Sequence, residues 1–108
     1  MKIANIHSVK DWFEVLQTTS HSQTAVMKLP PGQASGEEAE SHEESEQSLL
    51  LLEGQLLAEI SGHKSTMHSG DVIIIPARRK HKFTNNGDKM AITFNVYCPP
   101  EYPPDQKG

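Results

Sequence analysis

The stretch GDVIIIPARRKHKFTN, residues 70–85, decides the fold class of this chain. Gly70 is followed by five residues and Pro76, and then by His81 and Asn85, so the spacing is G-x5-P-x4-H-x3-N. The apolar run before the proline is rich in β-branched residues, which favour a strand, and the glycine and proline at its ends mark turns. This segment therefore predicts a short strand that ends at the proline.

Turn signals recur along the rest of the chain at short intervals. They lie at 30–32, 53–54, 61–62, 69–71 and 85–88. Between them are runs that favour strands, at 24–29, 47–53, 55–60, 71–76 and 90–97. Short strands with a turn roughly every eight to twelve residues are typical of a β-sandwich or β-barrel, so we predict an all-β fold. The residues expected in its apolar interior are Leu49, Leu51, Ile74, Phe83, Ile92, Phe94 and Val96.

The segment near the N-terminus fits two structures. Apolar residues recur there with the spacing of one helix face, at Val9, Trp12, Phe13 and Leu16. A short helix is one prediction for this segment, and an edge strand from Trp12 to Thr18 is the other. Either choice leaves the functional argument unchanged.

Length and composition indicate one cytoplasmic domain. The chain has 108 residues and a single cysteine, Cys98, so we expect one domain over residues 1–108, with a barrel core at about 20–98 and a proline-rich tail at 99–108. There is no apolar N-terminal segment and no apolar run near the roughly 18 residues of a membrane helix, so no membrane partner is expected. The net charge of −4 argues against nucleic acid as a partner, because neutralising phosphates needs a basic face.

The spacing from Gly70 to Asn85 resembles the second signature of the cupin superfamily. The first cupin signature, G-x5-H-x-H-x3,4-E-x6-G, is then expected between Gly36 and Gly54. The resemblance implies an antiparallel double-stranded β-helix, the jelly-roll or cupin barrel, which holds its ligands in the interior. Because cupins include dioxygenases, decarboxylases, isomerases, epimerases and non-enzymatic binding proteins, the fold leaves the function open.

The match to the first signature is incomplete. Gln47 stands seven residues before Gly54, where the pattern has glutamate, and His42 lies five residues before Gln47. Glu40 occupies the position of the other histidine, two residues before His42. A second alignment takes His42 as the first histidine and Glu44 in place of the second, but it leaves only two residues before Gln47, fewer than the family pattern.

The resemblance implies a metal site built from His42, His81, Glu40 and Gln47. Glu40 and His42 are two residues apart, so an extended strand would turn both to one face, and His81 would arrive from the second signature. Two imidazoles and one carboxylate match the facial arrangement of non-haem iron(II) sites, to which Gln47 would add a neutral amide oxygen. We therefore expect a divalent metal ion: iron, manganese, nickel or zinc.

Opposite charges flank the two signatures. Six glutamates lie within residues 37–46, and four cations lie within residues 78–82. Arg78 stands where the cupin pattern has a glycine, which brings cations near the mouth of the barrel. Two roles are open for them: pairing with the glutamates, worth about 0–1 kcal/mol for each exposed pair, or binding a small anionic ligand. Arg78 and Asn85 are accordingly expected to line the ligand pocket.

Three functions remain open. The first is a metal-binding cupin that binds or transforms a small organic molecule, for example by iron(II)- or manganese-dependent oxidation of a small acid or phenol. The second is a metal-free binding module, in which the same histidines and glutamine hydrogen-bond the ligand. The third is a sugar isomerase or epimerase with His81 as general base, for which only Trp12, Tyr97 and Tyr102 suggest a sugar platform.

The leucines of residues 47–53 indicate self-association. Leu49 and Leu51 share one face of the predicted strand, and Leu50 and Leu52 share the other. One of these faces can pack into the core, while the other would be an exposed apolar patch unless something covers it. We expect a second copy of the chain to cover it, which gives a homodimer.

Overall fold

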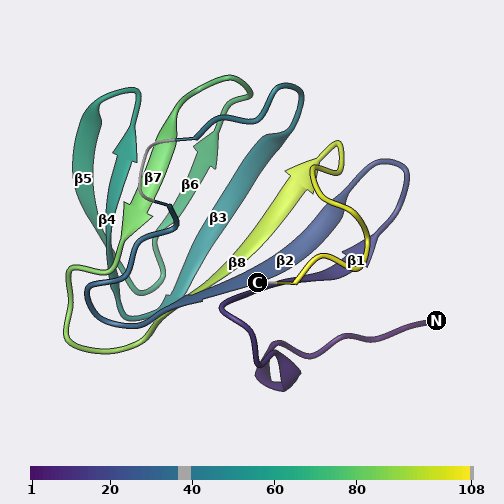
Figure 1. Ribbon diagram of the computed structural model, residues 1–108, viewed down its shortest axis with the longest axis horizontal. Coiled ribbons are helices and arrows are strands. Elements are labelled where there is room, and N and C mark those ends of the chain that lie inside the picture. The colour runs from purple at the N-terminus through teal and green to yellow at the C-terminus, as the bar shows by residue number, and fades with distance from the viewer. Residues whose placement is uncertain (37–39, 108) are drawn as a thin grey trace.

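The computed structural model describes residues 1–36 and 40–107, so Glu37 and Glu38 of the acidic run lie outside the described residues (Figure 1). Within these ranges the chain forms, in order, a 3-10 helix η1 (Ile6–Ser8) and the strands β1 (Phe13–Thr18), β2 (Gln23–Leu29), β3 (Glu46–Glu53), β4 (Gln55–Ile60), β5 (His63–His68), β6 (Val72–Ile75), β7 (His81–Thr84) and β8 (Ala91–Cys98). The predicted all-β fold is confirmed.

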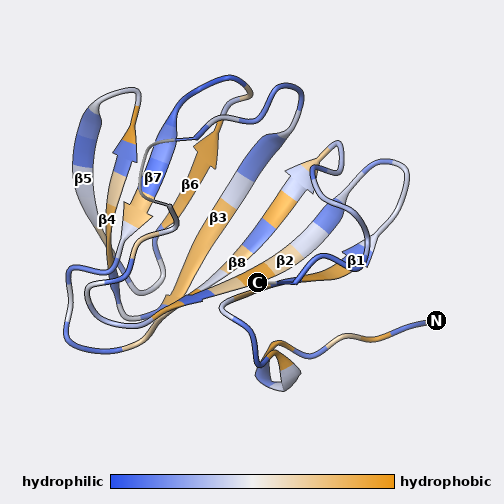
Figure 2. Ribbon diagram, viewed as in Figure 1, coloured by the Kyte–Doolittle hydropathy of each residue, from blue (hydrophilic) through white to orange (hydrophobic). Residues whose placement is uncertain are grey.

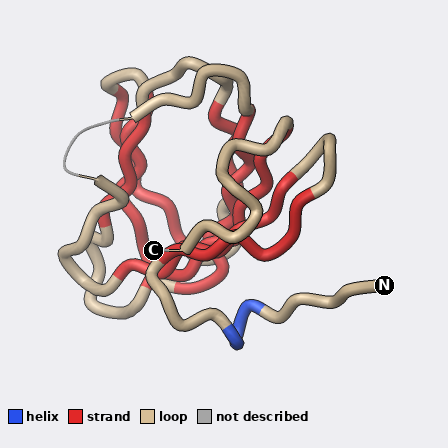
Figure 3. The backbone as a smooth tube through the Cα atoms, turned by 45° about the vertical axis from the view of Figure 1, so that its right-hand side comes forward, coloured by secondary structure: helices blue, strands red, loops and turns tan. Residues whose placement is uncertain are grey.

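Every pair of neighbouring strands is antiparallel. A five-stranded sheet has the order β1-β2-β8-β3-β6, and a three-stranded sheet has the order β5-β4-β7. The tube view in Figure 3 shows the strands curving round a common interior, as expected of a jelly roll. No helix in the described part of the chain has the length and apolarity needed to cross a bilayer.

The N-terminal segment that fitted two structures is a strand. Phe13 and Val15 alternate inward from β1 and are buried, and β1 pairs with β2 along its length. The helical alternative is therefore wrong. Pairing with β2 provides hydrogen bonds for the backbone N–H and C=O groups of this segment, and the alternation of side chains along a strand still buries its apolar residues.

The interior confirms part of the predicted core. Leu49, Leu51 and Phe83 are buried as expected. Ile74 is instead 57% exposed, and the inward residue beside it on β6 is Ile75. Figure 2 shows why alternation could not decide this strand, since β6 is hydrophobic along its whole length.

Strand β8 also turns the unexpected face inward. Its buried residues are Ala91, Thr93, Asn95 and Tyr97. The three residues that were predicted to be interior lie on the opposite face and are half-buried: Ile92, Phe94 and Val96. A shift of one residue exchanges the two faces of a strand, and both faces of this central strand carry large side chains, so the sequence pattern did not determine the choice.

Apolar side chains form a row on the outside of the five-stranded sheet. We call the outer face the surface formed by Leu50, Leu52, Val72, Ile74 and Phe94. Leu50 lies opposite Val72 on one side and Phe94 on the other, so the row crosses three adjacent strands. Val72 is 68% exposed on the edge strand β6. We propose that a second copy of the chain covers the outer face.

Leu50→Glu is expected to leave the protein monomeric if the proposed homodimer forms, because a carboxylate without a partner is costly to bury at the centre of an apolar interface. Light scattering at high micromolar concentration measures the mass. Thr66→Glu is the control, since Thr66 is exposed on β5 in the other sheet and gains the same charge. A wild-type protein that is monomeric at this concentration would contradict the proposal.

Candidate functional site

A cavity of about 250 Å³ lies between the inner faces of the two sheets. Its walls are mainly aromatic, with polar groups gathered around two histidines. The lining residues are Trp12, Phe13, Met27, Ser35, Glu40, His42, Gln47, His81, Phe83, Tyr97, Tyr102 and Gln106. There is no lysine or arginine among these residues, so within the described chain the cavity carries no permanent positive charge.

The two signature histidines lie side by side in this cavity. Their ring centroids are 4.9 Å apart, and both side chains are buried. Backbone hydrogen bonds hold the two segments together: the amide of Glu40 donates to the carbonyl of His81, and the amide of His81 donates back. His42 is attached in the same way, since its carbonyl accepts from the amide of Arg78 at 2.6 Å.

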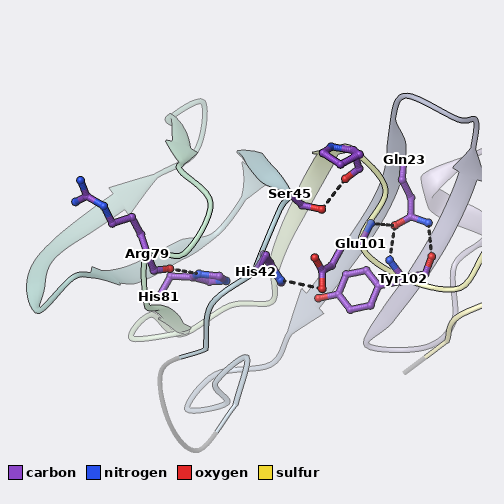
Figure 4. Close-up of polar contacts among 8 residues, drawn as sticks. Gln23, His42, Ser45, Arg79, His81, Glu101 and Tyr102 are labelled. Carbon is purple, nitrogen blue, oxygen red and sulfur yellow. Dashed lines mark hydrogen bonds and ion pairs between the residues drawn. The ribbon is translucent and has the colours of Figure 1, made fainter.

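Each imidazole is held through its Nδ1 atom. The Nδ1 of His42 lies 3.4 Å from the carboxylate Oε2 of Glu101, and the Nδ1 of His81 lies 3.1 Å from the carbonyl oxygen of Arg79. Figure 4 shows the two rings between these acceptors. Since a carbonyl and a carboxylate can only accept, these two contacts favour the neutral tautomer with its proton on Nδ1 and a lone pair on Nε2. Both histidines therefore offer an acceptor nitrogen.

The surroundings of His81 keep this ring neutral. Burial lowers the pKa of His81 below its ordinary value of 6.5, and the neighbouring His42 lowers it further. The hydrogen bond to Arg79 and the nearby carboxylates of Glu40 and Glu101 oppose this shift without reversing it. A neutral imidazole is the form that coordinates a metal or acts as a base.

Gln47 supplies a third acceptor. It lies on β3 opposite Tyr97 of β8, whose ring is 5.5 Å from that of His42. The Nε2 of Gln47 donates to Oδ1 of Asn95 at 3.0 Å. Its Oε1 is buried and has no hydrogen-bond partner among the described residues. An orphaned buried oxygen costs about 1–3 kcal/mol, so this atom points to a partner that the protein itself does not provide.

The carboxylate of Glu40 does not complete a ligand cluster. Glu40 lines the cavity, but its side chain is exposed. In the described residues no group of three or more His, Cys, Asp or Glu side chains is placed to hold a metal ion. Glu44, the alternative from the second alignment, is exposed and is not among the lining residues. The geometry thus brings together His42, His81 and Gln47, with Glu40 at the rim.

Arg78 lies outside the cavity, contrary to expectation. Its side chain is exposed, and its Nε donates to the backbone carbonyl of Glu43 at 3.2 Å. Its φ of 66° explains why the cupin pattern has glycine here, because the turn needs a left-handed conformation. The arginine therefore ties together the loops of the two signatures and does not line the pocket.

Asn85 is also a structural residue and not a pocket residue. Its Nδ2 donates to the carbonyls of Leu29 and Lys89, both at 2.7 Å, and its Oδ1 accepts from the amide of Gly87 at 2.8 Å. These bonds shape the turn before β8 and tie it to the end of β2. The correction follows from these contacts, which join residues up to 56 positions apart in sequence.

The C-terminal segment, expected to be a tail, forms one wall of the cavity. Tyr102 and Gln106 line the cavity, and Glu101 holds His42. The buried Gln23 fastens the segment: its Oε1 accepts from the amides of Glu101 and Tyr102, and its Nε2 donates to the carbonyl of Tyr102 at 2.8 Å (Figure 4). Ser45 adds a bond of 2.6 Å to the carbonyl of Pro99. The only sequence signal for this wall was the presence of aromatic residues beside the prolines.

Two tyrosines complete the polar end of the cavity. The rings of Tyr97 and Tyr102 meet edge to face at 5.3 Å. Burial raises the pKa of Tyr97 well above 10, and burial also raises the pKa of Tyr102. Both phenols are therefore protonated at neutral pH.

Comparisons with known proteins agree with this architecture. The family model described as "Cupin domain" matches residues 25–97. The protein BH2720 of Bacillus halodurans superposes with a TM-score of 0.88 at 23% identity, over 98% of this chain and 86% of that one. The protein TT1209 of Thermus thermophilus gives a TM-score of 0.80 at 20% identity, over 92% and 98%. No curated protein matches the sequence.

A third solved structure has a functional description. It is a predicted oxalate decarboxylase, tm1287 of Thermotoga maritima, with a TM-score of 0.71 at 22% identity over 82% of this chain and 81% of that one. Identities this low show a shared fold and leave the ligand of this chain to be argued from its own residues.

Proposed function

Because this chain belongs to the cupin family, we propose that it binds a divalent metal ion through His42, His81 and Gln47 and receives a small organic molecule in the cavity beside that ion. The observation that carries the proposal is a set of three acceptor atoms for which no hydrogen-bond donor is found among the described residues: two Nε2 lone pairs and the orphaned Oε1 of Gln47. Because all three residues line one cavity, a cation bound between them would satisfy these atoms together.

The support around the histidines fits metal binding. Metal-ligating histidines almost always donate their other ring N–H to a carboxylate, a carbonyl or water, which fixes the tautomer. Glu101 and Arg79 stand in these positions. Imidazole and oxygen ligands suit iron, manganese, nickel and zinc, and three protein ligands leave coordination positions open for an organic ligand or water. A metal bound here would supply Lewis acidity, or dioxygen or water activation, at those positions.

The cavity walls define what the protein contributes to the organic ligand. Trp12, Phe13, Phe83 and the two tyrosines offer apolar surface for a flat or aliphatic body. The volume of about 250 Å³ is below the range of about 300–1,000 Å³ for pockets that hold drug-sized molecules, so the ligand is small. With no lysine or arginine among the described lining residues, an anionic group on this ligand finds its counter-charge at the metal ion.

Elemental analysis of protein purified without a polyhistidine tag tests the proposal. We expect close to a single equivalent of iron, manganese, nickel or zinc, or uptake of one of these ions by the stripped protein in calorimetric titration. Protein stripped with a chelator is the control.

If the stripped protein takes up none of the four ions, the metal-free binding module replaces this proposal. The same three acceptors would then receive hydrogen bonds from a donor-rich ligand. The rim position of Glu40, which leaves no carboxylate in the cluster, is the observation that favours this second candidate.

A further inference from the structure

A buried polar chain runs along the inner face of β8. Thr93 and Asn95 are 0% and 1% exposed, in a barrel whose neighbouring inward residues are apolar. Burying a hydroxyl and an amide is costly unless both are hydrogen-bonded, and two apolar residues of similar size would fill the same space. The pair therefore needs an explanation beyond packing.

The direction of each hydrogen bond in this chain can be derived from its fixed end. The carbonyl oxygen of Met27 can only accept, so the hydroxyl of Thr93, 3.3 Å away, donates to it. The Oγ1 of Thr93 then accepts from Nδ2 of Asn95 at 2.9 Å, and the same Nδ2 faces the carbonyl of Ala25 at 3.5 Å. The NH2 group of Asn95 is thus bonded to Thr93 and to Ala25 of β2, and its Oδ1 faces Gln47.

The last link follows in the same way. The Oδ1 of Asn95 can only accept, so the Nε2 of Gln47 donates to it, at 3.0 Å. The Oε1 of Gln47 is left on the other side of the amide, buried and without a partner among the described residues. Turning the amide over would set Oε1 against Oδ1 of Asn95, two acceptors with no proton between them.

We propose that Thr93 and Asn95 are positioning residues that fix the polarity of the Gln47 amide, so that this side chain presents oxygen and not NH2 to the cavity. A carboxylate presents oxygen whichever way it turns, whereas an amide does so in only one of its two orientations. A protein with glutamine at this position therefore needs hydrogen-bond partners that fix the orientation of its amide. This inference rests on the proposed function in one respect, that the Gln47 oxygen binds a cation. The orientation of the amide does not depend on the metal and can be measured in the metal-free protein.

Thr93→Val tests the chain, with Thr93→Ser as the matched variant that keeps the hydroxyl. Substitutions of residues that orient metal ligands typically cost about 10–100-fold in metal affinity. We expect Thr93→Val to weaken nickel(II) binding, measured by calorimetry, by at least about 10-fold, and Thr93→Ser to stay within about 3-fold of wild type.

A double-mutant cycle separates positioning from general damage to the core. In a Gln47→Glu background either orientation of residue 47 presents oxygen to the cavity, and loss of the Thr93 hydroxyl frees the Asn95 amide to turn its NH2 group to the carboxylate, so Thr93→Val is expected not to weaken nickel(II) binding. An equal loss in the glutamine and glutamate backgrounds would overturn the proposal and leave the metal site standing, because the valine would then act on the fold and not on the amide.

A metal-free measurement keeps the two proposals distinguishable. In the stripped protein, the side-chain NH2 protons of Gln47 are expected to exchange slowly with solvent in NMR spectra and to show contacts to Asn95. Thr93→Val is expected to speed this exchange and Thr93→Ser to leave it slow. If none of the four ions binds but these signals behave as expected, the metal proposal fails and the proposed role of Thr93 and Asn95 holds. Fast exchange of the Gln47 NH2 protons in the wild-type protein would overturn the proposed role of Thr93 and Asn95.

Discussion

Replacing His42 or His81 by alanine is expected to lower the affinity for nickel(II) by more than about 100-fold, beyond the range for residues that only orient ligands. Each change removes one of two imidazoles from a site whose third protein ligand is a neutral amide, so a single nitrogen and an amide oxygen remain. Calorimetric titration of the stripped variants measures the loss.

Two matched pairs control this result. His63→Ala and His68→Ala remove exposed imidazoles on β5 that do not line the cavity, and we expect both to bind nickel(II) as the wild type does. Glu40→Ala is expected to weaken binding more than Glu44→Ala, because only Glu40 lies at the rim of the cavity. Glu37 would be a further control by sequence, but it lies outside the described residues. An equal loss of nickel(II) affinity in the cavity and surface histidine variants would refute the proposal that His42 and His81 bind the metal.

Nickel(II) binding is also expected to weaken as the pH falls below about 6, because protons compete with the metal for imidazole nitrogens. Burial lowers the pKa of His81 below its ordinary value, so this ring becomes protonated only at a lower pH than an exposed histidine does. Titrations at several pH values measure the trend. An affinity that stayed constant down to about pH 5 would mean that the imidazoles are not ligands.

Gly54→Ala is expected to destabilise the fold by about 3 kcal/mol or more, at the upper end of single-residue effects. Gly54 joins β3 to β4 with a φ of +87°, and a Cβ there would lie 2.6 Å from the carbonyl oxygen of Met90 and 2.9 Å from Cα of Ala91. Both contacts are to backbone at the start of β8, which pairs with β3 and cannot move aside without breaking the sheet. Urea unfolding at a fixed protein concentration measures the change.

Gly62→Ala is the matched control for this substitution. Gly62 has a φ of +83°, but its added Cβ would meet no atom of the described residues within 4 Å. The Gly62→Ala variant therefore measures only the cost of the left-handed backbone conformation, about 1–2 kcal/mol for a residue with a side chain. Equal losses in the two variants would mean that the contact between the β3–β4 turn and β8 is not tight in solution.

Turn spacing and strand composition determined the fold class of this protein. Glycines and prolines at short intervals limit each run of β-favouring residues to strand length, and that information is local. The signature spacing likewise placed His42, His81 and Gln47 at the positions that converge on the cavity. The resemblance was sufficient for this because such positions are set by the number of residues between turns.

The faces of β6 and β8 were decided only by the tertiary structure. Alternation shows which residues share a face, but it does not show which face is buried. Ile74 and Ile75 on opposite faces of β6 are equally apolar, and the two faces of β8 carry Phe94 and Tyr97, either of which could fill the interior. The choice depends on which face the other sheet and the C-terminal segment cover, and that is a property of strands paired far apart in sequence.

The chemistry of the candidate site was also beyond the sequence. Nothing local marks Glu101 as the partner of His42 or Asn95 as the partner of Gln47. Each of these contacts joins positions that are brought together only by strand pairing or by the C-terminal wall, such as the 48 positions between Gln47 and Asn95. The sequence by itself determined that His42, His81 and Gln47 reach the barrel interior. Which atom each of them offers there depends on directed hydrogen bonds between strands, and only the tertiary structure sets those directions.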